Sequence, residues 1–123
     1  STKSSVILEV GIAADLRVVT SRQFPFALHY FTGSKEHNVA MRALAQSKGL
    51  KLNEYELVGE SGSVPCSEEG DIFRALGLDP IAPELREDTG EIDAAATGSL
   101  PHLVELSDIT GVFHCHTTAS DGR

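Results

Sequence analysis

Three groups of residues have types and spacings that suit metal or phosphate chemistry. Asp15 stands in an otherwise apolar run, and the string Tyr-Phe-Thr-Gly-Ser at 30–34 comes directly before a long helical pattern. Near the end of the chain, His114 and His116 precede Asp121, and on an extended strand both imidazoles point to one side. Carboxylates and imidazoles bind metal ions, and helix N-termini receive phosphate groups. The sequence therefore offers two candidate sets of metal ligands and one candidate anion site.

Asp15 has two interpretations. A carboxylate in an apolar strand is costly unless it is paired or holds a cation. Arg17 lies two residues later on the same face, so an ion pair at a sheet edge is one interpretation. A Mg²⁺ ligand is the other, because this ion takes one or two carboxylates together with substrate phosphates. One aspartate is not a complete site, so we expect partner carboxylates before Ser1, in a longer protein.

The string at 30–34 also has two interpretations. Gly33 permits a close backbone approach, Ser34 is a good N-cap, and the free N–H groups of a helix start attract anions. Tyr30 and Phe31 offer aromatic surface to a base or a sugar. The alternative is an ordinary capped helix whose aromatic residues belong to the core.

A polar stripe follows along the same helix and is typical of a solvated face, with residues at i, i+4 and i+8; it consists of Asn38, Arg42 and Gln46. Val39, Ala43 and Leu44 lie toward the expected apolar side. The stripe alone does not distinguish a binding surface from an ordinary solvated one.

The surrounding pattern predicts an α+β fold, with a small antiparallel sheet and two to four helices. Two β-branched runs around Gly11 predict a hairpin, over 6–10 and 12–19. Caps and glycine stops predict helices over 23–30, 35–48, 67–76 and 91–96. Short strands are expected over 50–55, 57–58, 103–106 and 109–116. The acidic stretch from Glu84 to Glu91 reads as a linker, packed by Leu85 and Ile92, with its acids in solvent.

Charge is distributed unevenly along the 123 residues, whose net charge is −8. Residues 1–51 carry seven Lys and Arg against three acids, a net +4, whereas residues 52–123 carry three against fifteen, a net −12. A basic front half can hold a polyanion, since binding depends on local charge. No apolar run suits a membrane span. The two cysteines, Cys66 and Cys115, fit no zinc or disulfide pattern, so reduced thiols in a cytoplasmic protein are expected.

Four strings together carry a resemblance: DLRVV at 15–19, YFTGSKEHNVAMR at 30–42, GLKLNEY at 49–55 and PELREDTGEI at 83–92. In this order they resemble the palm-to-thumb region of family X DNA polymerases of the bacterial branch. The resemblance implies the end of a palm domain over 1–22, a thumb over 23–90 and a linker over 91–107. It also implies a DNA primer–template and a deoxynucleoside triphosphate as partners, in the bacterial cytoplasm near the nucleoid.

The resemblance assigns roles by position. Asp15 is implied as the third catalytic carboxylate, holding Mg²⁺ or Mn²⁺. Arg17 is implied as a catalytic neighbour that pairs with site carboxylates and shifts on closure, with Glu54 and Tyr55 as candidate partners. Nucleotide contacts are implied for Tyr30, Phe31, Gly33, Ser34 and Asn38, and a template contact for Arg42. Contacts at Lys35 and Glu36 are not carried over, because some eukaryotic relatives have other residue types there.

The C-terminal string from Gly111 to Gly122 resembles the opening of a PHP (polymerase and histidinol phosphatase) domain, expected over 108–123. The resemblance assigns His114, His116 and Asp121 as ligands of Zn²⁺ or Mn²⁺ in a metal-dependent phosphoesterase, such as a 3′–5′ exonuclease. Two incidental histidines are the alternative for His-x-His alone.

The expected function is part of a family X DNA polymerase acting in DNA repair. This stretch alone is expected to be inactive and to hold no metal firmly, because most ligands of both sites lie outside it. Two alternatives remain open: a noncatalytic nucleic-acid-binding module, and a phosphoesterase based on the C-terminal motif. The chain is expected as a monomer or as a dimer paired through an exposed strand edge.

Overall fold

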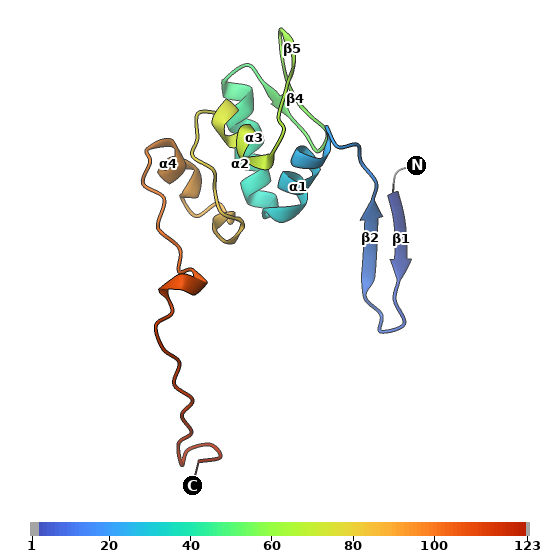
Figure 1. Ribbon diagram of the computed structural model, residues 1–123. Coiled ribbons are helices and arrows are strands. Elements are labelled where there is room, and N and C mark those ends of the chain that lie inside the picture. The colour runs from blue at the N-terminus through green and yellow to red at the C-terminus, as the bar shows by residue number, and fades with distance from the viewer. Residues whose placement is uncertain (1–2, 123) are drawn as a thin grey trace.

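The computed structural model describes residues 3–122, so the outermost residues of the expected palm and PHP segments lie outside it. A hairpin, a packed helical body and an extended C-terminal tail follow one another (Figure 1). The elements are β1 (Lys3–Ile7), β2 (Ala13–Arg17), α1 (Phe24–Thr32), α2 (Lys35–Ser47), β3 (Lys51–Leu52), β4 (Leu57–Gly59), β5 (Gly62–Val64), α3 (Glu69–Ala75) and α4 (Glu91–Ala96). Two 3₁₀ turns, η1 (Pro83–Leu85) and η2 (Leu106–Asp108), complete the order. The predicted α+β class is confirmed.

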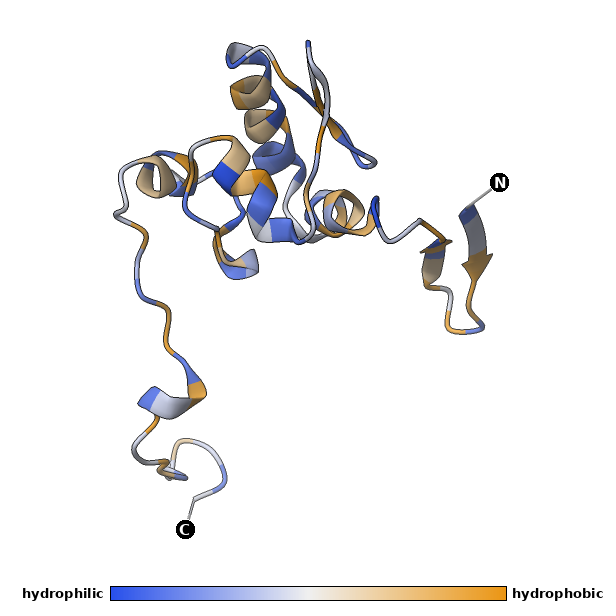
Figure 2. Cartoon of the chain, turned by 45° about the horizontal axis from the view of Figure 1, so that its top comes forward, coloured by the Kyte–Doolittle hydropathy of each residue, from blue (hydrophilic) through white to orange (hydrophobic). Residues whose placement is uncertain are grey.

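The hairpin pairs β1 with β2 in antiparallel register, with Ser5 opposite Asp15. Its first strand begins and ends about three residues earlier than predicted. The reason is the turn, in which Gly11 adopts a φ of 81° and its N–H donates to the Leu8 carbonyl, so Glu9 and Val10 leave the strand. The strands stand clear of the helices, and their hydrophobic stretches face solvent (Figure 2). Among residues 3–122 no further strand pairs with either edge of this two-stranded sheet, and the edge-paired dimer stays a prediction.

The hydrophobic core lies between α1, α2, α3 and the three-stranded sheet β3-β4-β5. Pro25 fits the first turn of α1, and Ser34 caps α2 by accepting from the His37 N–H at 3.0 Å. The most deeply buried apolar side chains are Met41, Ala45, Leu57, Ile72, Phe73, Leu76 and Ile81. Burying each large side chain contributes about 1.5–3 kcal/mol, so these helices are fixed by tertiary packing rather than by propensity alone.

The small sheet differs from the predicted one. The strand predicted over 50–55 is reduced to β3, because the side chain of Asn53 accepts from the N–H groups of Tyr55 and Glu56 and bends the chain. The strand β5, which the sequence did not predict, begins within the turn-rich stretch 59–63. Gly62, with a φ of 108°, closes a tight turn and lets β5 pair with β4.

The acidic stretch before α4 is part of the packed body. Leu85 and Ile92 pack against the core as predicted, but the prediction that all its acids are solvated is wrong for Glu91, which is 6% exposed. Arg86 is also buried, at 2%. The expected linker over 91–107 therefore begins with a helix that packs on the core, and packed residues continue to Leu100.

The tail after residue 100 contains no strand within the part of the chain that the structure describes, so the strands predicted over 103–106 and 109–116 are wrong. Its apolar side chains, such as Val104 and Phe113, are 82% and 92% exposed. A strand needs a partner for its backbone groups, and the tail lies away from the other elements (Figure 1). Among the described residues, no helix has the length and apolar content to cross a membrane.

His29 is a buried histidine on α1, only 2% exposed, with its ring edge on Phe73. Burial, aided by the neighbouring His37 and Arg86, lowers its pKa to about 3. Its Nε2 has no hydrogen-bond partner among the described residues. The folded state therefore holds His29 neutral, and protonation favours the unfolded chain.

We expect the free energy of unfolding to fall by about 2 kcal/mol between pH 7 and pH 5 through His29 alone. A lowered histidine pKa gives stability that is present above the unfolded pKa and is lost as pH falls through and below about 6.5. Urea denaturation of His29→Phe at both pH values should show a shallower pH dependence. His102→Ala, in the exposed tail, is the matched control and should keep the wild-type slope; equal slopes in both variants would contradict the role of His29.

Candidate functional site

Asp15 projects from β2 next to the opposing strand. Its Oδ1 accepts from the Ser5 hydroxyl at 2.5 Å, and its Oδ2 lies 2.8 Å from the Lys3 ammonium. Lys3, and then Ser5, lower the pKa of Asp15 below its usual value. The side chain is 54% exposed, so an ionised carboxylate faces solvent. Such a group suits a hard cation such as Mg²⁺ as one ligand among several.

Arg17 contacts α1 and the 53–55 turn, and its positive charge also contributes to lowering the pKa of Asp15. Its Nη1 donates to the Tyr55 hydroxyl at 3.0 Å, and its guanidinium lies 5.8 Å from the centre of the Phe31 ring. The Asn53 turn described above fixes the backbone of Tyr55. Of the two expected partners, Tyr55 makes the contact. The guanidinium thus connects β2 to both α1 and the 53–55 turn.

The turn between α1 and α2 is held by close packing. Gly33 has a φ of −85°, which any residue adopts, so its backbone does not require glycine. Space does: a Cβ at Gly33 would lie 2.9 Å from the Cδ2 of His37. The Asn38 side chain donates to the Tyr30 carbonyl at 2.9 Å and the Gly33 carbonyl at 3.5 Å. Asn38 therefore fixes the shape of the turn.

The polar stripe of α2 does not form one solvated face. Asn38 is 8% exposed, whereas Arg42 and Gln46 are exposed, and the Arg42 Nε donates to the Asn38 carbonyl at 3.3 Å. The predicted apolar side is correct for Leu44, which packs against the core, and wrong for Val39 and Ala43, which are exposed. The buried side lies one residue before each position of the polar stripe, at His37, Met41 and Ala45.

The turn and α2 form one surface hollow of about 300 Å³, lined by Tyr30, Phe31, Gly33, Lys35, Asn38 and Arg42. Five of these were expected as nucleotide or template contacts. Ser34 is absent from the lining because it caps α2, and Lys35 is present although no contact was expected there. A larger hollow of about 800 Å³ lies beside α1 and β5, but Tyr55 is its only member that sequence analysis linked to the site. The smaller hollow is therefore the candidate functional site.

The C-terminal motif brings its three side chains into pairs. The Nδ1 of His116 lies 2.5 Å from the Asp121 carboxylate, and its Nε2 contacts the Nε2 of His114. The contact with His116 lowers the pKa of Asp121 below its usual value. No group of three His, Cys, Asp or Glu side chains between residues 3 and 122 is arranged to hold a metal ion.

Comparisons with known proteins identify the family of the helical body. A family profile described as DNA polymerase beta thumb matches residues 27–87. The DNA polymerase/3'-5' exonuclease PolX of Bacillus subtilis (strain 168) is 41% identical over 127 residues, covering 98% of this chain and 22% of that protein. The chain belongs to the family X DNA polymerases and contains their thumb. It spans about a fifth of the length of that PolX relative.

Two further relatives agree with this family X thumb. DNA polymerase lambda of Rattus norvegicus is 39% identical over 85 residues, covering 59% of this chain and 15% of that protein. The crystal structure of Leishmania infantum polymerase beta in a ternary P/T complex superposes with a TM-score of 0.58 and 33% identity. It covers 61% of this chain and 36% of that one. The thumb, its turn and the helices around the hollow therefore belong to an established architecture.

Proposed function

We propose that this thumb region serves template-directed nucleotidyl transfer, in which a primer 3′-hydroxyl attacks the α-phosphate of a deoxynucleoside triphosphate. The observation that carries the proposal is the hollow beside the α1–α2 turn, where aromatic, amide and cationic groups gather. Aromatic rings stack on bases and sugars, and cations bind phosphate. The similarity to DNA polymerases selects this ligand among other anionic, planar molecules.

Each residue has a defined task in this proposal. Asp15 would hold Mg²⁺ or Mn²⁺ together with carboxylates from the rest of the protein, and the ion supplies Lewis acidity to the phosphoryl group. Tyr30 and Phe31 present their rings to the sugar of the nucleotide. Asn38 keeps the turn in shape and faces the nascent base pair. The Arg42 guanidinium, exposed at the rim, contacts the template strand.

Arg42→Ala tests the proposal in the polymerase that carries this chain. We expect kcat/KM for the correct nucleotide to fall about tenfold, because one phosphate contact on the template is lost, and the salt dependence of DNA binding to weaken by about one unit of slope. Single-nucleotide gap filling and binding titrations at several salt concentrations measure both quantities. Gln46→Ala, one turn along the same helix and outside the hollow, is the matched control. Equal effects of the two variants would argue against the site.

A second activity is favoured by the pairing of His116 with Asp121. We propose that His114, His116 and Asp121 would contribute ligands for Zn²⁺ or Mn²⁺ to a PHP-type phosphoesterase, completed by residues outside this chain. His114→Ala should then abolish metal-dependent 3′–5′ exonuclease activity and leave polymerisation intact. Cytoplasmic location and a role in DNA repair accompany the proposal as predictions.

A further inference from the structure

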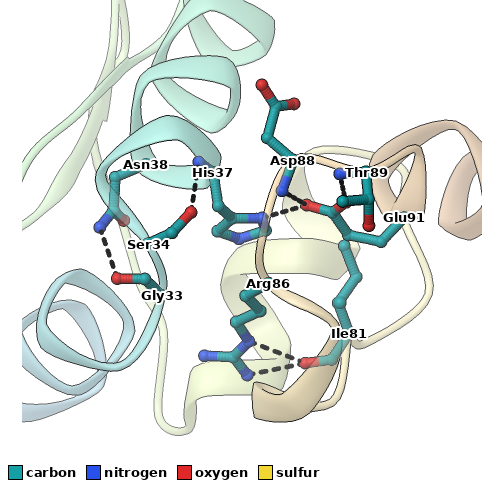
Figure 3. A network of polar contacts seen from close by, with 9 residues as sticks. All are labelled: Gly33, Ser34, His37, Asn38, Ile81, Arg86, Asp88, Thr89 and Glu91. Atoms are coloured by element: carbon teal, nitrogen blue, oxygen red, sulfur yellow. Dashed lines mark hydrogen bonds and ion pairs between the residues drawn. The ribbon is translucent and has the colours of Figure 1, made fainter.

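A buried network connects the α1–α2 turn to the segment 86–91 behind it (Figure 3). The Ser34 N–H donates to the Arg86 carbonyl at 3.0 Å. One helical turn along α2, the Nδ1 of His37 lies 2.6 Å from the Oε1 of Glu91. Ser34 and His37 of this network are therefore chain neighbours of Gly33 and Asn38, which line the hollow.

Glu91 accepts most of the hydrogen bonds in this network. Its Oε1 also accepts from the Asp88 N–H at 3.1 Å, and its Oε2 accepts from the Thr89 N–H at 2.8 Å. Burial alone would raise the pKa of Glu91, but His37 and these backbone donors outweigh it and lower the pKa below its usual value. The carboxylate is therefore ionised, and the imidazole presents its Nδ1–H to it.

The His37 ring has no room to move. It is fully buried, and a Cβ added at Gly33 would meet it at 2.9 Å. Its Nε2 has no hydrogen-bond partner in the described part of the chain, so Glu91 is the polar group that orients the ring. A shift of this ring toward the turn would displace Gly33, whose carbonyl accepts from the Asn38 side chain.

The energetic cost of burying His37 and Glu91 indicates that this pair does more than stabilise the core. Two polar groups lose their water on burial, and an apolar pair of similar size often stabilises a core equally well. Hydrogen bonds add direction, since they fix both distance and angle. A hydrogen-bonded pair at this position is better suited to setting the geometry of the turn than to adding stability.

We propose that His37 and Glu91, with the Arg86 carbonyl, are positioning residues for the nucleotide site. They hold the α1–α2 turn at the angle that places Gly33 and Asn38 against the incoming nucleotide. This inference rests on the proposed function and deepens it, because it assigns the nucleotide affinity of the hollow partly to residues that never touch the nucleotide. The segment 86–91 then acts as a support of the site.

The test is single-turnover incorporation by the polymerase that carries this chain. Both carboxylate oxygens of Glu91 accept hydrogen bonds from N–H groups. In Glu91→Gln an NH₂ group replaces one of these acceptors and faces an N–H donor. In His37→Phe the imidazole donor is lost. For both we expect the apparent Kd for the nucleotide to rise about tenfold, since the competent turn becomes a minor population. The rate at saturating nucleotide should change less than about threefold, because the reacting groups are intact.

Two further variants separate positioning from folding. His37→Asn keeps an N–H near the Nδ1 position and should restore the apparent Kd to within about threefold of wild type. Glu87→Gln removes an exposed acid of the same segment and should match wild type. If Glu91→Gln does not fold, the difference between His37→Phe and His37→Asn decides. Equal affinities of His37→Phe and His37→Asn would overturn the proposal.

A readout without nucleotide separates this inference from the proposed function. The amide signals of Gly33 and Asn38, followed by NMR in the 123-residue chain, should move in His37→Phe and stay in place in Glu87→Gln. If the amide signals of Gly33 and Asn38 do not move in His37→Phe, the proposal that the network fixes the shape of the turn is wrong. Moved signals together with a normal Arg42→Ala enzyme would support the network and reject the nucleotide site.

Discussion

Asp15→Ala is expected to lower nucleotide incorporation by the polymerase that carries this chain at least about a thousandfold, which corresponds to roughly 4 kcal/mol of transition-state stabilisation. The carboxylate faces solvent from the hairpin and supports no part of the core. Its removal should therefore leave the fold intact and take away a metal ligand. Asp15→Asn, which keeps the shape and the acceptor for Ser5, should lose nearly as much activity because the charge is gone.

Primer extension and exonuclease assays on the same preparations measure this prediction. Exonuclease activity should survive in Asp15→Ala, which distinguishes a lost ligand from a misfolded protein. Ser5→Ala keeps the carboxylate and removes one of its hydrogen bonds, so it should change the rate little. The 123-residue chain by itself should not extend a primer. Rapid extension by Asp15→Ala would show that Asp15 is no catalytic ligand.

Arg86→Met is expected to lower the free energy of unfolding by about 3–5 kcal/mol, a large part of the 5–15 kcal/mol typical of a domain. The Arg86 side chain is 2% exposed and lies 5.1 Å from the centre of the Phe73 ring. Its guanidinium donates to both carboxylate oxygens of Glu69, at 2.5 and 3.0 Å, and to the Ile81 carbonyl. Methionine fills similar space but leaves these acceptors without a donor.

Urea denaturation followed by circular dichroism measures the loss. Arg74→Met is the matched control, because Arg74 pairs with Glu68 and Asp71 at the surface, where ion pairs contribute little. Adding Glu69→Met to Arg86→Met should recover part of the stability, since no unpaired carboxylate then remains. A loss as small as that of Arg74→Met would mean that the guanidinium is dispensable to the core.

Local signals in the sequence predicted the helices well. Ser34 caps α2 and Gly49, with a φ of 72°, follows its end as expected. Long-range pairing was harder to predict. The strand β5 depends on a turn at Gly62, and the tail strands failed because a β-rich string says nothing about whether a partner strand is near.

In the candidate site, too, local features could be predicted from the sequence and long-range contacts could not. The string at 30–34 predicted Ser34 as the cap of a helix, and Ser34 caps α2; the nucleotide contacts of this string stay predictions. Asn38 was assigned to a solvated stripe, because periodicity identifies a face but not which face packs inward. The partnership of His37 with Glu91 joins residues 54 positions apart, and no local pattern encodes it. The expected domain boundaries stay predictions.

The close approach of Gly33 to His37 limits which amino-acid substitutions these positions can accept. A side chain at 33 needs a smaller one at 37, and a residue at 37 without a donor leaves the buried Glu91 carboxylate without its side-chain partner. Substitutions at positions 33, 37 and 91 are therefore expected to depend on one another, although Glu91 lies 54 positions after His37.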